Sequence, residues 1–177
     1  MARQSQTRLG MKNLSILVAT DFSEGSLVAI EAALDLGSVL KLPPRLTLVH
    51  VWSGAEARMP ELTLKTDSEG SSARLLQEAR THGLALEGAA EFLARLEKRG
   101  VKADAWMMRG PVAETIAATA GDGDFDLVIL GTHGRGGLSG AILGSVAEKV
   151  VRLSIVPVLT ARMREQKPST TALSARS

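Results

Sequence analysis

The chain has 177 residues, a length typical of one domain, and its 45 % hydrophobic and 23 % charged residues are ordinary for a globular protein. The absence of cysteine excludes disulfides and thiolate chemistry, and no apolar run reaches the ~18 residues of a membrane-spanning helix, so we expect no membrane partner. The net charge of +2 comes from basic residues at the two ends of a mildly acidic body, and without interleaved aromatic residues this pattern does not favour a nucleic-acid partner.

The first third of the chain predicts an alternation of strands and helices. Residues 14–20 (LSILVAT) are a short apolar run rich in β-branched residues, which predicts a buried strand. Helical spacing follows over 21–42 and stops at a Pro-Pro pair. A second strand is predicted over 45–51. Residues 52–72 show no clean period, and we interpret them as a long, mobile connection.

The rest of the chain continues the alternation. Gly100 is a natural end for a long helix, and Pro157 argues for an edge position of the last strand. The predicted elements are a helix over 73–100, a strand over 101–108, a turn and short helix over 109–124, a strand over 126–130, a helix over 144–153 and a strand over 154–161.

This order predicts an α/β fold with an open parallel sheet and helices on both faces. In such sheets ligands bind beyond the carboxyl ends of the strands, where the strand order reverses. The candidate site residues are therefore those that follow the strands. They lie at 19–21, 51–52, 109–111 and in the glycine-rich stretch that starts at residue 131.

The stretch GTHGRGGLSGAILGS, residues 131–145, has six glycines in fifteen positions between a strand and a helix. Amides at a helix start are unpaired, and glycine lets an anion approach the main chain closely, so the stretch predicts a phosphate site. Ser145 adds a hydroxyl, and His133 and Arg135 could add a ring donor and a charge. The stretch is neither a P-loop nor a GxGxxG fingerprint. The alternative is a loop whose glycines only permit turns.

The spacing Gly131-x2-Gly134-x9-Gly144-Ser145 resembles the G-x2-G-x9-G-[S/T] pattern of the universal stress protein family. The segments ILVATDFSEGS, LTLVHV, GPVAETI and SIVPVL also resemble that family, and the resemblance runs from about residue 13 to 161. It implies a Rossmann-like five-stranded parallel sheet of order 3-2-1-4-5. The domain would span 13–161, between disordered tails at 1–12 and 162–177.

The resemblance also implies a site, because the glycine pattern marks the ATP-binding members of the family. Residues after the first strand would meet adenosine, the carboxylate of Asp21 the ribose, the main chain of Val51 the adenine, and the glycine-rich stretch the phosphates. Arg135 lies in the nine-residue spacer, which the pattern does not fix, and is our addition as a phosphate partner. The expected contacts are Ala19, Thr20, Asp21, Val51, Leu130, Gly131, His133, Gly134, Arg135, Gly144, Ser145 and Val146.

Several residues have a structural alternative. Asp21, with Glu24 three residues later, could instead form a capping box at the helix start. His50 is expected to be a hydrogen-bonded core histidine. Trp52 could flank the adenine or cover the end of the sheet. No pair of histidines has metal-ligand spacing, so no metal site is expected.

The expected function is that of an ATP-binding universal stress protein that acts as a stress-response or signalling module, with Mg²⁺ as an optional companion of ATP. A homodimer through the last strand is expected, and the lack of a targeting signal favours the cytoplasm. One alternative is a slow ATPase or phosphoryl-transfer enzyme, although the chain lacks the P-loop lysine. The second is a dimeric scaffold that binds no nucleotide.

Overall fold

The structure is a computed structural model, and it describes residues 13–53, 62–65, 77, 87–132 and 143–162. The predicted tails therefore lie outside the described residues, apart from Arg162. The strands are β1 (Leu14–Ala19), β2 (Pro44–Trp52), β3 (Leu62–Lys65), β4 (Ala103–Arg109), β5 (Leu127–Gly131) and β6 (Val158–Ala161). The helices are α1 (Glu24–Leu40), α3 (Glu87–Lys98), α4 (Val112–Asp122) and α5 (Ser145–Leu153).

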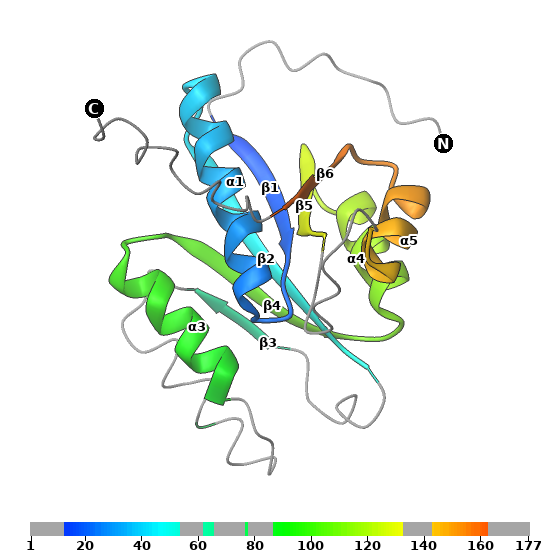
Figure 1. The fold of residues 1–177 in the computed structure, drawn as a ribbon, viewed down its shortest axis with the longest axis horizontal. Helices are drawn as coiled ribbons and strands as arrows, with labels where there is room; N and C mark the ends of the chain where they lie inside the picture. Colours follow the sequence, from blue (N-terminus) through cyan, green and yellow to red (C-terminus); the bar gives the residue numbers. More distant parts are fainter. Residues whose placement is uncertain (1–12, 54–61, 66–76, 78–86, 133–142, 163–177) are drawn as a thin grey trace, which may run out of the picture.

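The described strands form one sheet in the order β3-β4-β2-β1-β5-β6 (Figure 1). β1, β2, β4, β5 and β6 pair in parallel. Numbered among themselves, these five strands have the order 3-2-1-4-5, so the predicted fold is confirmed. Because β1 is flanked by β2 on one side and β5 on the other, the strand order reverses between β1 and β5, at the centre of the sheet.

β3 is the part of the sheet that the sequence interpretation missed. It pairs with β4 in antiparallel register, with Leu62 opposite Met107 and Lys65 opposite Asp104. The interpretation of 52–72 as a connection is therefore wrong for 62–65, and the residues around β3 lie outside the described part. The local signal was the short alternation Leu-Thr-Leu-Lys, which is typical of a strand.

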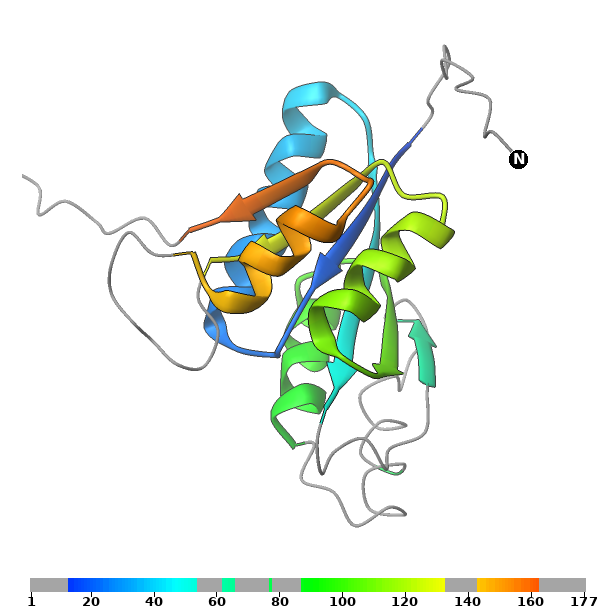
Figure 2. The same cartoon turned by 90° about the vertical axis from the view of Figure 1, so that its right-hand side faces the viewer.

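Two hydrophobic cores lie on opposite faces of the sheet, and helices cover both faces (Figure 2). On one face, α1 and α3 pack Ile30 and Phe92 against Ile16 and Val18 of β1. On the other face, α4 and α5 pack apolar side chains against Leu17 and the neighbouring strands. β1 is buried on both faces, which explains why its sequence reads as a nearly continuous apolar run.

Most element ends differ from the predicted ends by a few residues, but α3 begins at Glu87, and residues 73–76 and 78–86 of the helix predicted over 73–100 lie outside the described residues. α1 begins at Glu24 and ends at Leu40, where Lys41 adopts a left-handed conformation with φ 53° and its amide contacts the last carbonyls of the helix. Gly100 has φ 67°, as expected of a glycine that ends a helix. β6 is confined to Val158–Ala161 and pairs only with β5 among the described strands, which agrees with the edge position that Pro157 predicts.

Within the described ranges, no helix combines the length and the hydrophobicity needed to cross a membrane.

Candidate functional site

The carboxyl ends of the parallel strands form one edge of the sheet, which we call the carboxyl edge. At this edge β1 continues into a tight turn before α1. The amide of Thr20 donates to the carbonyl of Val49 at 2.9 Å, so the chain leaves β1 while still bound to β2. Phe22 then adopts a left-handed conformation with φ 62°, which is strained for a residue with a side chain. Its amide donates to Thr20 Oγ1 at 2.9 Å, which holds the bend.

Asp21 lies inside this turn, half-buried, and its carboxylate is the centre of a small hydrogen-bond network. Oδ1 of Asp21 accepts bonds from the Ser23 amide at 3.1 Å, the Ser23 hydroxyl at 2.6 Å and the Ser26 hydroxyl at 2.7 Å. The amide of Asp21 in turn donates to Ser26 Oγ at 3.0 Å. The turn therefore holds both the main chain and the carboxylate of Asp21 in one arrangement.

The capping-box interpretation of Asp21 and Glu24 is wrong. The N-cap residue of α1 is Ser23, and its side chain makes no capping bond to the helix. Glu24 points instead to α3, where Arg95 donates to its two carboxylate oxygens at 2.6 and 3.3 Å. The Arg95 guanidinium holds the pKa of the Glu24 carboxyl below its ordinary value through this hydrogen bond, and the charge attraction acts in the same direction.

A row of aromatic rings supports the turn from the face that carries α1 and α3. The ring of His50 stacks on Phe22 with centroids 4.6 Å apart and meets Trp52 edge-on at 4.4 Å. Phe92 of α3 meets Phe22 edge-on at 5.6 Å. Nδ1 of His50 lies 2.8 Å from the carbonyl oxygen of Thr20, so this nitrogen carries the proton and donates. His50 is thus hydrogen-bonded and packed between aromatic rings, as expected, but it is half-buried.

Trp52 is buried with the core of this face, so it covers the end of the sheet. Its indole Nε1 is the one buried side-chain polar atom of the described residues that has no hydrogen-bond partner. Whether Trp52 also flanks an adenine stays a prediction.

β2 extends past β1 at the carboxyl edge. The register of β1 with β2 ends at the pair Ala19–Val49, whereas β2 continues to Trp52 and pairs with β4 as far as Arg109. The main chain of Val51 therefore lies beyond the part of β2 that pairs with β1. The Val51 side chain is buried in the core under α4 and α5, so its main chain is the part that a ligand could reach from this edge.

The two ends of the glycine-rich stretch meet beside β5. The amide of Thr132, directly after β5, donates to Ala161 of β6 at 2.9 Å. The amide of Gly144, directly before α5, donates to the Thr132 carbonyl at 2.9 Å. A Cβ at Gly144 would lie 2.9 Å from that same oxygen, so the close approach requires glycine. The start of α5 is thereby fixed at the carboxyl edge.

α5 presents its first turn outward. Ser145 and Val146 are exposed, and helix geometry gives their amides no carbonyl within the helix, since the Glu148 amide is the first to bond back to Gly144. These amides and the helix dipole make the first turn of α5 suitable for an anion.

The structure therefore brings the described candidates to one edge, where β1, β2, β5 and α5 meet (Figure 1). The sequence interpretation did not anticipate Ser23, Ser26 or Thr132. The spacing Asp-x-Ser-x-x-Ser around a helix start was the available signal for the two serines. His133, Gly134 and Arg135 lie outside the described residues. The candidates at this edge are Ala19, Thr20, Asp21, Val51, Leu130, Gly131, Gly144, Ser145 and Val146.

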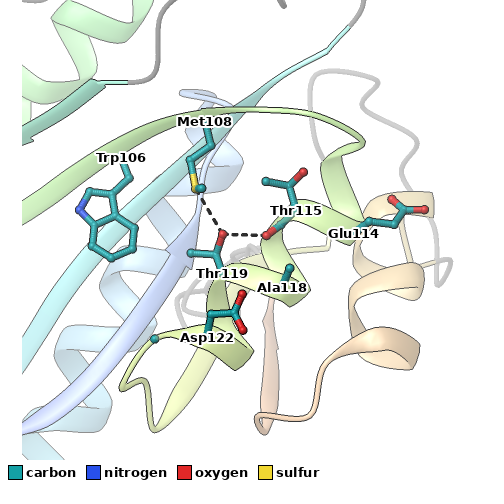
Figure 3. A pocket seen from close by; sticks show the side chains of 8 residues that line it. Trp106, Met108, Glu114, Thr115, Ala118, Thr119 and Asp122 are labelled. Carbon is teal, nitrogen blue, oxygen red and sulfur yellow. Dashed lines mark hydrogen bonds between the residues drawn. The ribbon is translucent and has the colours of Figure 1, made fainter.

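A separate hollow of about 570 Å³ lies between β4 and α4 (Figure 3). Trp106 and Met108 form its strand side, and Glu114, Thr115 and Asp122 belong to the helix side. The hydroxyl proton of Thr119 is directed to the Thr115 carbonyl at 2.7 Å, with Met108 Sδ at 3.2 Å. None of the predicted site residues lines this hollow.

Among the described residues, no three His, Asp or Glu side chains are grouped so that they could hold a metal ion.

Residues 13–162 match the universal stress protein family. The chain is 33 % identical over 149 residues to the universal stress protein YxiE of Bacillus subtilis, with 83 % of this chain and 97 % of YxiE covered. The likeness therefore extends over nearly all of the described residues and over nearly the whole of a curated relative.

Solved structures share the fold. The structure of the hypothetical protein MJ0577 superposes with a TM-score of 0.59 at 27 % identity, covering 88 % of this chain and 99 % of that one. The Arabidopsis thaliana protein At3g01520, a universal stress protein family member solved with AMP bound, superposes with a TM-score of 0.52. It is 19 % identical, covers 89 % of this chain and 97 % of its own, and bears on the fold alone.

Proposed function

Because the chain belongs to the universal stress protein family, we propose that it binds an adenine nucleotide, ATP in the first place, at the carboxyl edge and acts as a stress-response or signalling module in the cytoplasm. The single observation that carries the proposal is the contact of Gly144 with Thr132. It holds the two ends of the glycine-rich stretch together beside the strand-order reversal, where open α/β sheets bind ligands.

The described donor and acceptor groups suit the three parts of a nucleotide. The outward amides of Ser145 and Val146 suit phosphate oxygens. The carboxylate of Asp21 suits ribose hydroxyls, and the main chain of Val51 suits the edge of the adenine. The At3g01520 protein, which shares this fold, was solved with AMP bound, so an adenine nucleotide is the ligand class to test first.

His133, Gly134 and Arg135 complete the proposed phosphate site on the strength of the sequence pattern alone. Mg²⁺ would arrive with the phosphates of ATP, which supply oxygen ligands for it. The part of the chain that the structure describes offers no cluster of His, Asp or Glu side chains for the metal, so the phosphates would be its main ligands.

The direct test is to identify what the purified protein carries. Protein prepared without added nucleotide is heat-denatured, and the supernatant is analysed by mass spectrometry for ATP and AMP. Separately, emptied protein is titrated with ATP while its melting temperature is recorded. We expect a nucleotide in the supernatant and a higher melting temperature with ATP. Asp21→Ala should weaken both effects, whereas Asp35→Ala, an exposed position on α1, should change neither.

Protein that carries no nucleotide and does not respond to ATP would contradict the proposal and favour the nucleotide-free scaffold. Phosphate release measured on the same samples addresses the enzyme alternative. Release that disappears in Asp21→Ala and persists in Asp35→Ala would assign slow ATP hydrolysis to this site.

We also propose that the protein is a homodimer through β6. β6 is an edge strand, and edge strands present unpaired main-chain groups that favour pairing with a second chain. Apolar side chains on β6 and in the segment before it are exposed, with Ile155 79 % exposed, and exposed apolar side chains of this kind suit an interface. The others are Val151, Leu153 and Leu159.

A further inference from the structure

The hydroxyl of Ser26 connects the main chain and the side chain of Asp21. It accepts a hydrogen bond from the Asp21 amide at 3.0 Å and donates one to Asp21 Oδ1 at 2.7 Å. A serine hydroxyl has a single proton to donate, and here it is directed to the carboxylate. Ser26 is only 5 % exposed, so water does not replace these bonds readily.

Ser23 holds the same carboxylate oxygen from a second direction. Its amide and its hydroxyl donate to Asp21 Oδ1 at 3.1 and 2.6 Å. A carboxylate group is planar, so restraints on Oδ1 from two directions also limit where Oδ2 can lie. Hydrogen bonds to an ionised group are about twice as strong as those between neutral groups. The bonds from Ser23 and Ser26 therefore fix the position of the Asp21 carboxylate firmly.

These bonds are more than the usual start of a helix. A serine at the N-cap normally turns its hydroxyl to an amide of its own helix, but Ser23 makes no such bond. Ser26, in the first turn, also directs its hydroxyl out of the helix toward Asp21. Both serines therefore serve the carboxylate, although α1 would gain from a conventional cap.

We propose that Ser26 and Ser23 are positioning residues that make the site selective for ribose, because they aim the carboxylate of Asp21 at the sugar hydroxyls. Ser26 is the stronger of the two, since it fixes the Asp21 main chain as well as Oδ1. This inference rests on the proposed nucleotide binding. It assigns sugar selectivity to two side chains that need not touch the nucleotide.

The test compares ATP with 2′,3′-dideoxy-ATP, which lacks the hydroxyls that Asp21 would bind. The affinity of each nucleotide is measured by calorimetry for the full-length wild type and for Ser26→Ala, Ser23→Ala and Ser38→Ala. Ser38 is an exposed serine at the far end of α1 and serves as the matched control. The melting temperature of each variant is recorded without ligand.

We expect the wild type to bind ATP at least about tenfold more tightly than the dideoxy analogue, because a hydrogen bond to a charged group is lost. In Ser26→Ala this ratio should fall to about threefold or less, with the affinity for the analogue nearly unchanged. Ser23→Ala should give an intermediate ratio, and Ser38→Ala the wild-type ratio. If Ser26→Ala does not fold, the ratio of Ser23→Ala decides.

Other results would overturn the inference. If Ser26 had only a structural role, Ser26→Ala would lower the affinities for ATP and for the analogue by the same factor, and their ratio would stay at the wild-type value. If the wild type binds ATP and the analogue with equal affinity, Asp21 makes no contact with the sugar hydroxyls and the inference is refuted, but the proposed nucleotide binding still stands. A wild type that binds neither nucleotide would instead refute the proposed function, and the inference with it.

Discussion

The amide of Gly144 donates to the carbonyl oxygen of Thr132 at 2.9 Å, and a Cβ at Gly144 would lie the same 2.9 Å from that oxygen. Real Cβ atoms do not approach a carbonyl this closely, so the first turn of α5 would have to move away. We expect Gly144→Ala to lower the free energy of unfolding by about 1–3 kcal/mol. Because α5 is displaced, ATP affinity should fall at least about tenfold, measured by calorimetry.

Gly100→Ala is the control for this loss of affinity. Gly100 has φ 67° but open space around its Cα position, so alanine there costs about 1 kcal/mol of conformational strain without a clash. It precedes β4 and lies away from the carboxyl edge. We expect comparable destabilisation with unchanged ATP affinity. Equal affinity losses in both variants would mean that stability, and not the position of α5, controls binding.

The ion pair between Glu24 and Arg95 predicts a measurable titration. Arg95 lowers the pKa of the Glu24 carboxyl from its ordinary value of 4.5. The pair therefore stabilises the fold above that pH, and this contribution disappears as the pH falls through the lowered value. In Arg95→Gln, NMR should show the Glu24 carboxyl titrating at higher pH. Arg99→Gln, which removes the neighbouring pair with Glu31, should leave Glu24 unchanged. An unaltered Glu24 titration in Arg95→Gln would contradict the assignment.

Replacement of the apolar residues beside β6 should disrupt the proposed dimer. The double variant Ile155→Asp, Leu159→Asp puts two charges where an interface would be dry, so we expect it to be a monomer at concentrations where the wild type is a dimer, as measured by light scattering. Val39→Asp is the matched control, since Val39 is 77 % exposed on α1. A monomeric wild type, or a dimeric double variant, would rule out this interface.

Gly110, which follows β4, lies so close to Thr115 that a side chain at position 110 should clash, and a smaller residue at position 115 should relieve the clash. It has φ 140°, and a Cβ there would lie 2.6 Å from Thr115 Oγ1. Gly110→Ala should therefore be destabilised by about 2 kcal/mol or more, from the sum of backbone strain and clash. The added substitution Thr115→Ala should restore part of this loss, which denaturant unfolding would measure as a coupling between the two sites. Full additivity would show that strain of the main chain alone sets the cost.

The strand order could be predicted because its signals are local and strong. Residues 14–19 read as a continuous apolar run, since β1 is buried on both faces. β3 was missed because its alternating stretch is only four residues long. Such a short stretch does not stand out within a span that has no other pattern. Its place is decided by β4, forty residues later, and no local signal carries that information.

In the candidate site, too, features with a local sequence signal could be predicted, and features that depend on the fold could not. The glycine spacing predicted a close approach of an anion to the main chain, which stays a prediction, and the close approach of Gly144 to the Thr132 carbonyl was not anticipated. The spacing Asp-x-Ser-x-x-Ser could have pointed to Ser23 and Ser26, but the sequence did not predict the left-handed turn at Phe22 on which the bond from Ser26 to Asp21 depends. A phenylalanine gives no warning of such a turn, which only the surrounding rings and hydrogen bonds hold in place.

The position of β1 between β2 and β5 has a consequence for biosynthesis. β2 follows β1 closely in the chain, but β5 begins only at Leu127. Synthesis of β1 and β2 is therefore complete long before β5, the second neighbour of β1, is made, whereas β4 ends at Arg109, shortly before β5. Until then, the nascent chain exposes the bare side of its innermost strand, where another unfinished copy could attach. The carboxyl edge between β1 and β5 is therefore completed late, and translational stalling before β5 would leave an aggregation-prone fragment.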